Sequence, residues 1–133
     1  MNDRWELILD HYRNPRNYGS LPNADAAGKE VNILCGDEVE VQLKFDGNRI
    51  ENIRFQGTGC AISKAATSLL TEHVKGKTVS QVKRIGEKDV FALLRVDVTS
   101  SRTACALLGL KALKKAIRAR HGTTKMSSIK PSS

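Results

Sequence analysis

The clearest feature of the chain is a strict alternation of polar and apolar residues over 38–45. A period of two places the apolar side chains on one face of a β-strand, which is then half buried with its polar face toward water. Residues 46–48 are turn formers, and residues 49–56 are predicted to be the return strand of a hairpin. Because Ile50 and Ile53 are three positions apart in that strand, we expect a β-bulge between them.

Helical periodicity flanks the hairpin on both sides. Asp3 and Glu6 form a variant of the capping box, and the apolar residues within 5–12 predict a short amphipathic helix. Asn14 and Pro15 end this helix, and a loop rich in helix breakers follows. The remaining pattern predicts a strand over 28–34 that leads into Cys35, a helix from Cys60 to Gly76, two short helices over 79–85 and 89–95, and a long helix with Leu107, Leu110, Leu113 and Ile117 on one stripe.

Two of the three cysteines are predicted to lie at helix N-termini. Cys60 falls at the junction of a strand and a helix, and Cys105 falls in or just before the first turn of the last helix, which Ser100 or Ser101 could cap. Backbone amides at a helix N-terminus favour a thiolate. Trp5 and the leucine stripe are either core or partner-docking residues, and we prefer the core.

The composition supports a single domain. The chain has 133 residues, of which 40% are hydrophobic and 27% are charged, so it can bury an aliphatic core and is not disordered throughout. Pattern and composition predict one domain over residues 1–121, followed by a disordered basic tail over 122–133. Since no apolar stretch is long enough to span a membrane and the N-terminus carries no targeting signal, we predict a cytoplasmic protein without a membrane partner.

The net charge of +8 is concentrated at one end of the chain. Residues 111–133 contain seven basic and no acidic side chains, whereas residues 1–110 are almost balanced. No nucleic-acid-binding motif accompanies this charge, so nucleic acid is the least favoured partner. The basic helix is either a solvated surface or a docking patch for an acidic protein.

Cys35, Asp37, Cys60 and Cys105 form the candidate chemical site. One glycine separates Cys35 from Asp37 at the entry to a strand, so both side chains can turn toward one point. Three thiolates and one carboxylate would satisfy tetrahedral Zn²⁺ or hold a [2Fe-2S] cluster. The spacing alone leaves three alternatives open: buried structural cysteines, a metal or cluster site, and a redox or nucleophilic thiol.

Five separated segments carry a family resemblance, which extends over about residues 5–120. They are LDHYRNPRN at 9–17, CGD at 35–37, GTGCAIS at 57–63, VKGK at 74–77 and RTACA at 102–106. In this order they resemble the U-type iron–sulfur scaffold family, which comprises the IscU, SufU and NifU N-terminal proteins. The resemblance implies a compact α+β fold with a small antiparallel β-sheet packed against helices, and an exposed site made by Cys35, Asp37, Cys60 and Cys105.

The same resemblance implies a non-enzymatic carrier that assembles a transient [2Fe-2S] cluster from iron and persulfide sulfur. The implied partners are a cysteine desulfurase of the IscS, SufS or NifS type and iron–sulfur apoproteins, and the sequence is compatible with a monomer or a homodimer. A carboxylate holds iron less tightly than a thiolate, so Asp37 would keep the cluster transferable. Cys105 and Cys35 are the candidate persulfide acceptors, and Cys105 is preferred because Arg102 and a helix start lie close to it.

Two departures from the family pattern favour a second interpretation. Ala104 stands where the IscU members carry a histidine, and residues 98–102 stand where they carry a chaperone-binding segment. Arg102 resembles instead the SufU branch, whose members bind zinc and accept sulfur from their desulfurase. The alternative is therefore a zinc-dependent sulfurtransferase, although this chain is too short for the SufU insertion between the second and third cysteines. A third alternative is an interaction protein with inert cysteines.

Overall fold

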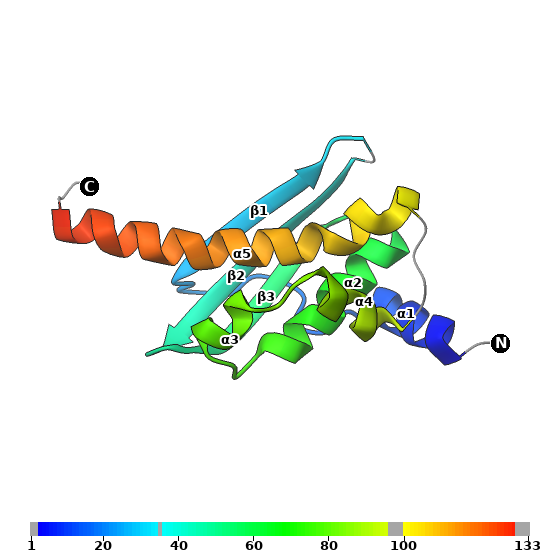
Figure 1. The fold of residues 1–133 in the computed structure, drawn as a ribbon, viewed down its shortest axis with the longest axis horizontal. Helices are drawn as coiled ribbons and strands as arrows, with labels where there is room; N and C mark the ends of the chain where they lie inside the picture. Colours follow the sequence, from blue (N-terminus) through cyan, green and yellow to red (C-terminus); the bar gives the residue numbers. More distant parts are fainter. Residues whose placement is uncertain (1–2, 35, 96–99, 130–133) are drawn as a thin grey trace.

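The computed structural model describes residues 3–34, 36–95 and 100–129, with side chains described at 5–34, 36–95 and 102–120. In these ranges an antiparallel sheet with strand order β1-β2-β3 is packed against helices, as predicted (Figure 1). The elements along the chain are α1 (Asp3–Arg13), β1 (Ala26–Asn32), β2 (Asp37–Asp46), β3 (Arg49–Thr58), α2 (Ala61–Val74), α3 (Val79–Lys83), α4 (Glu87–Leu94) and α5 (Ser100–Ile129).

The alternating pattern of β2 separates the two faces of the sheet. Val39, Val41 and Leu43 are at most 3% exposed and face the helices. The opposite face is only half exposed, because the loop between α1 and β1 crosses it. In that loop the backbone N–H of Leu21 donates to Oε1 of Gln42 at 2.6 Å.

The predicted β-bulge lies in β3 and is confirmed. Lys44 pairs with Asn52, but the next residue, Phe45, pairs with Ile50. Glu51 is therefore the extra residue of the bulge. Both isoleucines of β3 are buried as a result, since the bulge restores the alternation that their spacing would otherwise break.

The helices cover one face of the sheet and enclose the core. α5 lies along β1 and β2, α2 lies beside α5 and against β3, and α1 packs on α2 (Figure 1). Gly28 allows β1 and α5 to approach each other closely. A Cβ there would collide with the carbonyl oxygen of Ala112 and lie 2.5 Å from the backbone nitrogen of Ala116. The core is aliphatic, as the composition predicts; its buried members include Val41, Leu43, Ile50, Leu70, Val74, Leu107, Leu110, Leu113 and Ile117.

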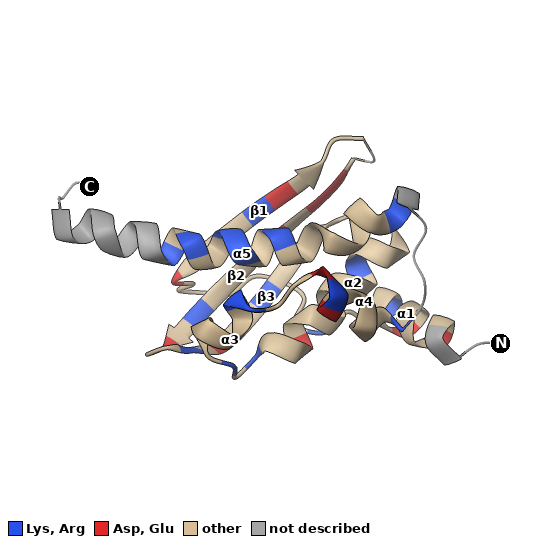
Figure 2. Ribbon diagram, in the orientation of Figure 1, with Lys and Arg blue, Asp and Glu red and all other residues tan. Residues whose placement is uncertain are grey.

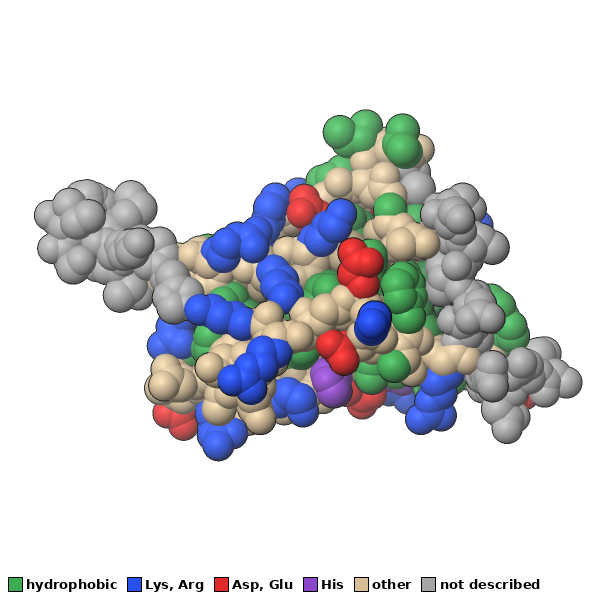
Figure 3. Space-filling view, viewed as in Figure 1, with side chains coloured by type: hydrophobic (Ala, Val, Ile, Leu, Met, Phe, Trp, Pro, Cys, Tyr) green, Lys and Arg blue, Asp and Glu red, His purple; other side chains and the backbone are tan. Residues whose placement is uncertain are grey.

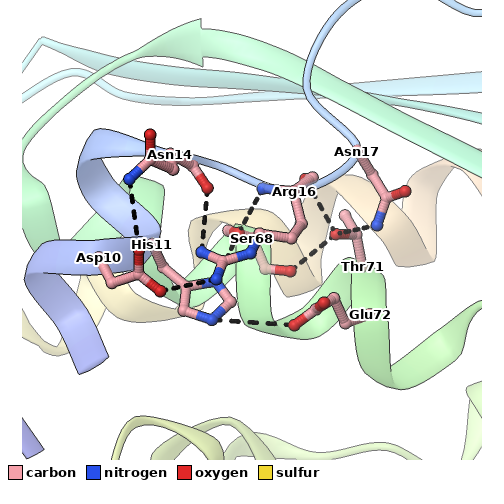
Figure 4. A network of polar contacts seen from close by, with 8 residues as sticks. All are labelled: Asp10, His11, Asn14, Arg16, Asn17, Ser68, Thr71 and Glu72. Atoms are coloured by element: carbon pink, nitrogen blue, oxygen red, sulfur yellow. Dashed lines mark hydrogen bonds and ion pairs between the residues drawn. The ribbon is translucent and has the colours of Figure 1, made fainter.

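A polar network fixes α1 and the following loop to α2 (Figure 4). The backbone N–H of Arg16 donates to Ser68 Oγ at 2.9 Å, and the same hydroxyl shares a hydrogen bond of 2.7 Å with Nδ1 of His11. Nε2 of His11 lies 3.8 Å from a carboxylate oxygen of Glu72. The pKa of His11 is lowered, first by burial and then by the nearby Arg16 charge. Arg16 also pairs with Asp10 at 2.6 Å.

Three expectations need correction or remain open. Trp5 is 44% exposed, so its assignment to the core is wrong, whereas the leucine stripe of α5 is buried as expected. α5 begins at Ser100, which places Cys105 in the second turn of the helix rather than in or before the first. The residues before Ser100 that would define its cap lie outside the described residues. α5 also continues to Ile129, into the segment predicted to be a tail, and the domain boundary at residue 121 stays a prediction.

None of the described helices combines the length and the apolar character that a membrane crossing requires. Basic residues recur along α5 (Figure 2), and Lys111, Lys115 and Arg118 are exposed. The ammonium group of Lys115 fixes this helix to the outer strand, because it donates to the backbone oxygen of Lys29 at 3.1 Å and pairs with Glu30 at 3.2 Å.

Candidate metal centre

Three of the four predicted site residues converge at one end of the sheet. Asp37 begins β2, Cys60 immediately precedes α2, and Cys105 lies in α5. A carboxylate oxygen of Asp37 and the two Sγ atoms all lie within 4.8 Å of one another. Cys35, the fourth predicted residue, lies outside the described residues, and its place in the site stays a prediction.

The carboxylate of Asp37 is buried without full hydrogen bonding. Its side chain belongs to a residue that is 5% exposed, and Oδ2 has no hydrogen-bond partner among the described residues. Gly36 precedes it with φ +76°, a left-handed conformation that allows the chain to turn sharply into β2. A buried polar atom without a partner is costly, so the arrangement favours a cation at this point.

Cys60 is positioned by the start of α2. Its backbone is extended, with φ −77° and ψ 171°, and its side chain forms no capping hydrogen bond, so Sγ is left for the site. The glycine before it leaves room for the site. A Cβ at Gly59 would lie 3.1 Å from Cγ of Asp37 and 3.2 Å from Oγ of Ser63. Cys60 is half buried at the N-terminus of α2.

Cys105 differs from Cys60 in its environment. It is 2% exposed and lies in the second turn of α5, where the backbone amides are already used within the helix. The helix N-terminus therefore favours a thiolate at Cys105 less than the sequence led us to expect, since this effect is confined to the first turn. Arg102 and Ala104, its neighbours on the same helix, are exposed.

The donor set fits a metal ion. Ligands of a tetrahedral Zn²⁺, at about 2.0–2.3 Å from the ion, lie roughly 3.5–3.8 Å apart, which a small adjustment of these side chains would reach. Two sulfur atoms and one oxygen leave one position for a further ligand. Thiolates suit zinc and iron–sulfur clusters, and the unpaired oxygen of Asp37 supplies the hard donor.

Two residues near the site were missed by the sequence reasoning. The hydroxyl of Tyr18 donates to the backbone oxygen of Gly57 at 3.2 Å, close to the turn that leads into Cys60. The ammonium of Lys64 lies over the rings of Tyr18 and Tyr12, at 4.9 and 5.7 Å from their centroids. The signal was present in the matching motif at 9–17 and in Tyr18, which directly follows it, but the loop that contains Tyr18 was interpreted by default as a connection.

The fold and the site together define a small α+β domain in which one carboxylate and at least two thiols face a common point. The family model for the NifU-like N terminal domain matches residues 4–126. The chain belongs to this family, which confirms the resemblance inferred from the separated motifs.

The similar proteins come from both branches of the family. The iron–sulfur cluster assembly scaffold protein IscU 1 of Archaeoglobus fulgidus is 38% identical over 112 residues, which cover 84% of this chain and 72% of the relative. The zinc-dependent sulfurtransferase SufU of Bacillus subtilis is 34% identical, with 88% of this chain and 90% of the relative covered. The crystal structure of a putative iron–sulfur cluster assembly scaffold protein for the SUF system (FiSufU) from Fervidobacterium islandicum AW-1 has a TM-score of 0.72 and 30% identity, and covers 84% of this chain and 94% of that one.

Proposed function

We propose that this protein is an iron–sulfur cluster assembly scaffold, which builds a transient [2Fe-2S] cluster and passes it to apoproteins. The observation that carries the proposal is the convergence of Asp37, Cys60 and Cys105, together with the unpartnered Oδ2 of Asp37. Cys35 is the proposed fourth ligand. Sulfur would arrive as a persulfide from a cysteine desulfurase, while iron and electrons come from other donors.

The mixed donor set suits a carrier that must release its cargo. Thiolates hold iron strongly, whereas a carboxylate is a weaker ligand for it. Asp37 would therefore be the ligand that a recipient displaces first. Because Cys60 is half buried, the centre is neither sealed inside the core nor fully in water, as transfer to another protein requires.

Burial argues against one of the two candidate persulfide acceptors, Cys105; the other, Cys35, lies outside the described residues. Sulfur transfer needs a thiolate that can reach the sulfur of a partner. At 2% exposure, Cys105 is poorly placed for that attack. We therefore propose Cys35 as the first acceptor, with Cys105 acting as a cluster ligand.

The extent of the alignments favours the scaffold over the sulfurtransferase. The alignment with IscU 1 is 112 residues long and covers 84% of this chain, so within it IscU 1 has no inserted segment that this chain lacks. The match with SufU spans 134 positions, more than the whole chain, although only 88% of the chain takes part. SufU therefore has residues that this chain lacks.

The second candidate function is a zinc-dependent sulfurtransferase. It is favoured by Ala104, since no histidine precedes Cys105, and by the identity to SufU. In that case the same residues would hold Zn²⁺, which stabilises a bound thiolate, and a cysteine would accept the persulfide from the desulfurase.

The deciding experiment is analysis of the protein purified without oxygen. Iron and acid-labile sulfide are measured together with zinc, and the visible spectrum is recorded. We expect equal amounts of iron and sulfide with charge-transfer bands, and loss of both in Cys60→Ser. One zinc per chain without sulfide, combined with strong stimulation of desulfurase turnover, would replace the scaffold by the sulfurtransferase.

A further inference from the structure

A second feature of the surface lies next to the candidate metal centre. Val31, Ile33 and Leu34, at the end of β1 and just beyond it, are 46%, 88% and 98% exposed. Large apolar side chains grouped in this way at a surface indicate an interaction site. They line a hollow that α5 completes with Ala104 and Leu108.

A basic hollow continues from the apolar one along α5. It is lined by Leu110, Lys111, Lys114 and Arg118, and it shares Lys111 and Glu30 with the apolar hollow. The charge of Glu30 is already paired with Lys115. Figure 3 shows basic side chains gathered over α5 and hydrophobic ones at the projecting end of β1.

The positive charges of this hollow are largely available. The ammonium of Lys114 donates to the backbone oxygen of Lys83 at 2.9 Å and keeps its charge. Lys111 and Arg118 have no hydrogen-bond or ion-pair partner within the described ranges. The two hollows together, which we call the β1–α5 surface, therefore combine an apolar end with an unneutralised basic end.

We propose that the β1–α5 surface binds a segment of a partner protein that carries apolar and acidic side chains. Apolar contacts surrounded by complementary charges are the usual composition of a protein interface. Nucleic acid fits this surface poorly, because half of it is apolar and Glu30 lies between the halves. The bound segment would lie beside the metal centre, since Leu34 and Ala104 directly precede Cys35 and Cys105.

The proposal does not rest on the scaffold function, because the surface could bind its partner whatever metal the site holds. The test uses the full chain and a phage-displayed library of random dodecapeptides. Peptides are selected on the wild-type protein, and the affinities of the enriched peptides, made synthetically, are measured at low and physiological salt. A duplex oligonucleotide serves as the nucleic-acid probe.

Two double variants divide the surface. Ile33→Ser with Leu34→Ser removes the apolar end, and Lys111→Glu with Arg118→Glu reverses the basic end. Lys75→Glu with Lys88→Glu is the matched control, because it changes the net charge equally at exposed positions outside the surface. All four substituted basic residues are exposed, so unfolding curves should remain close to those of the wild type.

We expect the enriched peptides to combine Asp or Glu with Leu, Ile or Phe. Each surface variant should weaken their binding at least tenfold, and the control variant less than twofold. Enrichment of basic or purely polar peptides would overturn the proposal, as would equal binding by all variants. Binding of the duplex that is lost only in Lys111→Glu with Arg118→Glu would assign the surface to nucleic acid instead.

Discussion

Asp37 is the residue in which the demands of folding and of metal binding conflict. Its carboxylate is buried at the start of β2, and Oδ2 finds no hydrogen-bond partner among the described residues. In the metal-free protein this costs free energy, whereas a bound cation would stabilise the same charge. Asp37 thus lowers the stability of the metal-free protein and raises the affinity of the site for a metal ion.

Replacing Asp37 should therefore have two measurable effects. In Asp37→Ala the free energy of unfolding of the metal-free protein should rise by about 1 kcal/mol, measured by urea denaturation, because an unpaired buried oxygen is removed. The reconstituted cluster should also persist several times longer, followed by visible absorbance in the presence of an iron chelator under nitrogen. Glu38→Ala is the control, since Glu38 is the neighbouring carboxylate and pairs on the surface with Lys29 at 3.0 Å. Faster loss of the cluster in Asp37→Ala would contradict the proposed role.

His11 should make the stability depend on pH. Burial, followed by the Arg16 charge, lowers the pKa of His11 in the folded protein below its usual value near 6.5. The unfolded chain then binds a proton that the folded chain does not, so stability is lost as the pH falls below about 6.5, by at most about 1.4 kcal/mol per pH unit. We expect His11→Gln to flatten the dependence between pH 6.5 and 5 in urea unfolding. If the free energy of unfolding of His11→Gln depended on pH as steeply as that of the wild type, other groups would be the cause of the pH dependence.

The periodicity of apolar residues predicted which helices and strands form better than it predicted the residues at which they begin and end. The spacing of Ile50 and Ile53 is sufficient to predict the bulge, because both must face the core. The start of α5 was harder to place, since Ser100 and Ser101 are equally good caps and the pattern of buried leucines begins only later. Trp5 was misassigned because an apolar residue type does not by itself show burial: it lies in the first turn of α1 and is 44% exposed.

The packing of α5 on β1 is predicted to be sensitive to a single methyl group. In Gly28→Ala the added Cβ would meet the backbone of Ala112 and Ala116, which cannot move without shifting the helix. We expect a loss of about 1–3 kcal/mol in the free energy of unfolding, as for other overpacked sites. Because α5 carries Cys105, the affinity for Zn²⁺ should fall as well, measured by competition with a chromophoric chelator.

Gly86→Ala is the matched control for this substitution. A Cβ at Gly86 has no atom within 4 Å, so the change should cost only the N-cap preference for Gly over Ala, about 0.5–1 kcal/mol. If both variants were equally stable, the contact between the helix and the strand would be more adaptable than the structure indicates.

The assembly of the site belongs to the molecule as a whole. Asp37, Cys60 and Cys105 come from a strand, a helix start and the interior of another helix, and their separation in sequence matches no compact metal motif. Spacing alone therefore left several uses for the cysteines open. The family motifs supplied the grouping, but the burial of Asp37 and Cys105 and the half-burial of Cys60 follow only from how α2 and α5 pack on the sheet.

A metal bound by all three segments should stabilise them together, and hydrogen exchange with Zn²⁺ as the probe can test this. Binding to the native state alone raises stability with ligand concentration, and local opening that breaks the site must first release the metal. We expect slower exchange at the start of β2, in the first turn of α2 and in the second turn of α5. The turn between β2 and β3 should change little, because it lies at the other end of the strands. Cys60→Ser should remove the protection from all three segments at once, whereas protection that persisted at α5 in this variant would mean that Cys105 binds the metal without the other two.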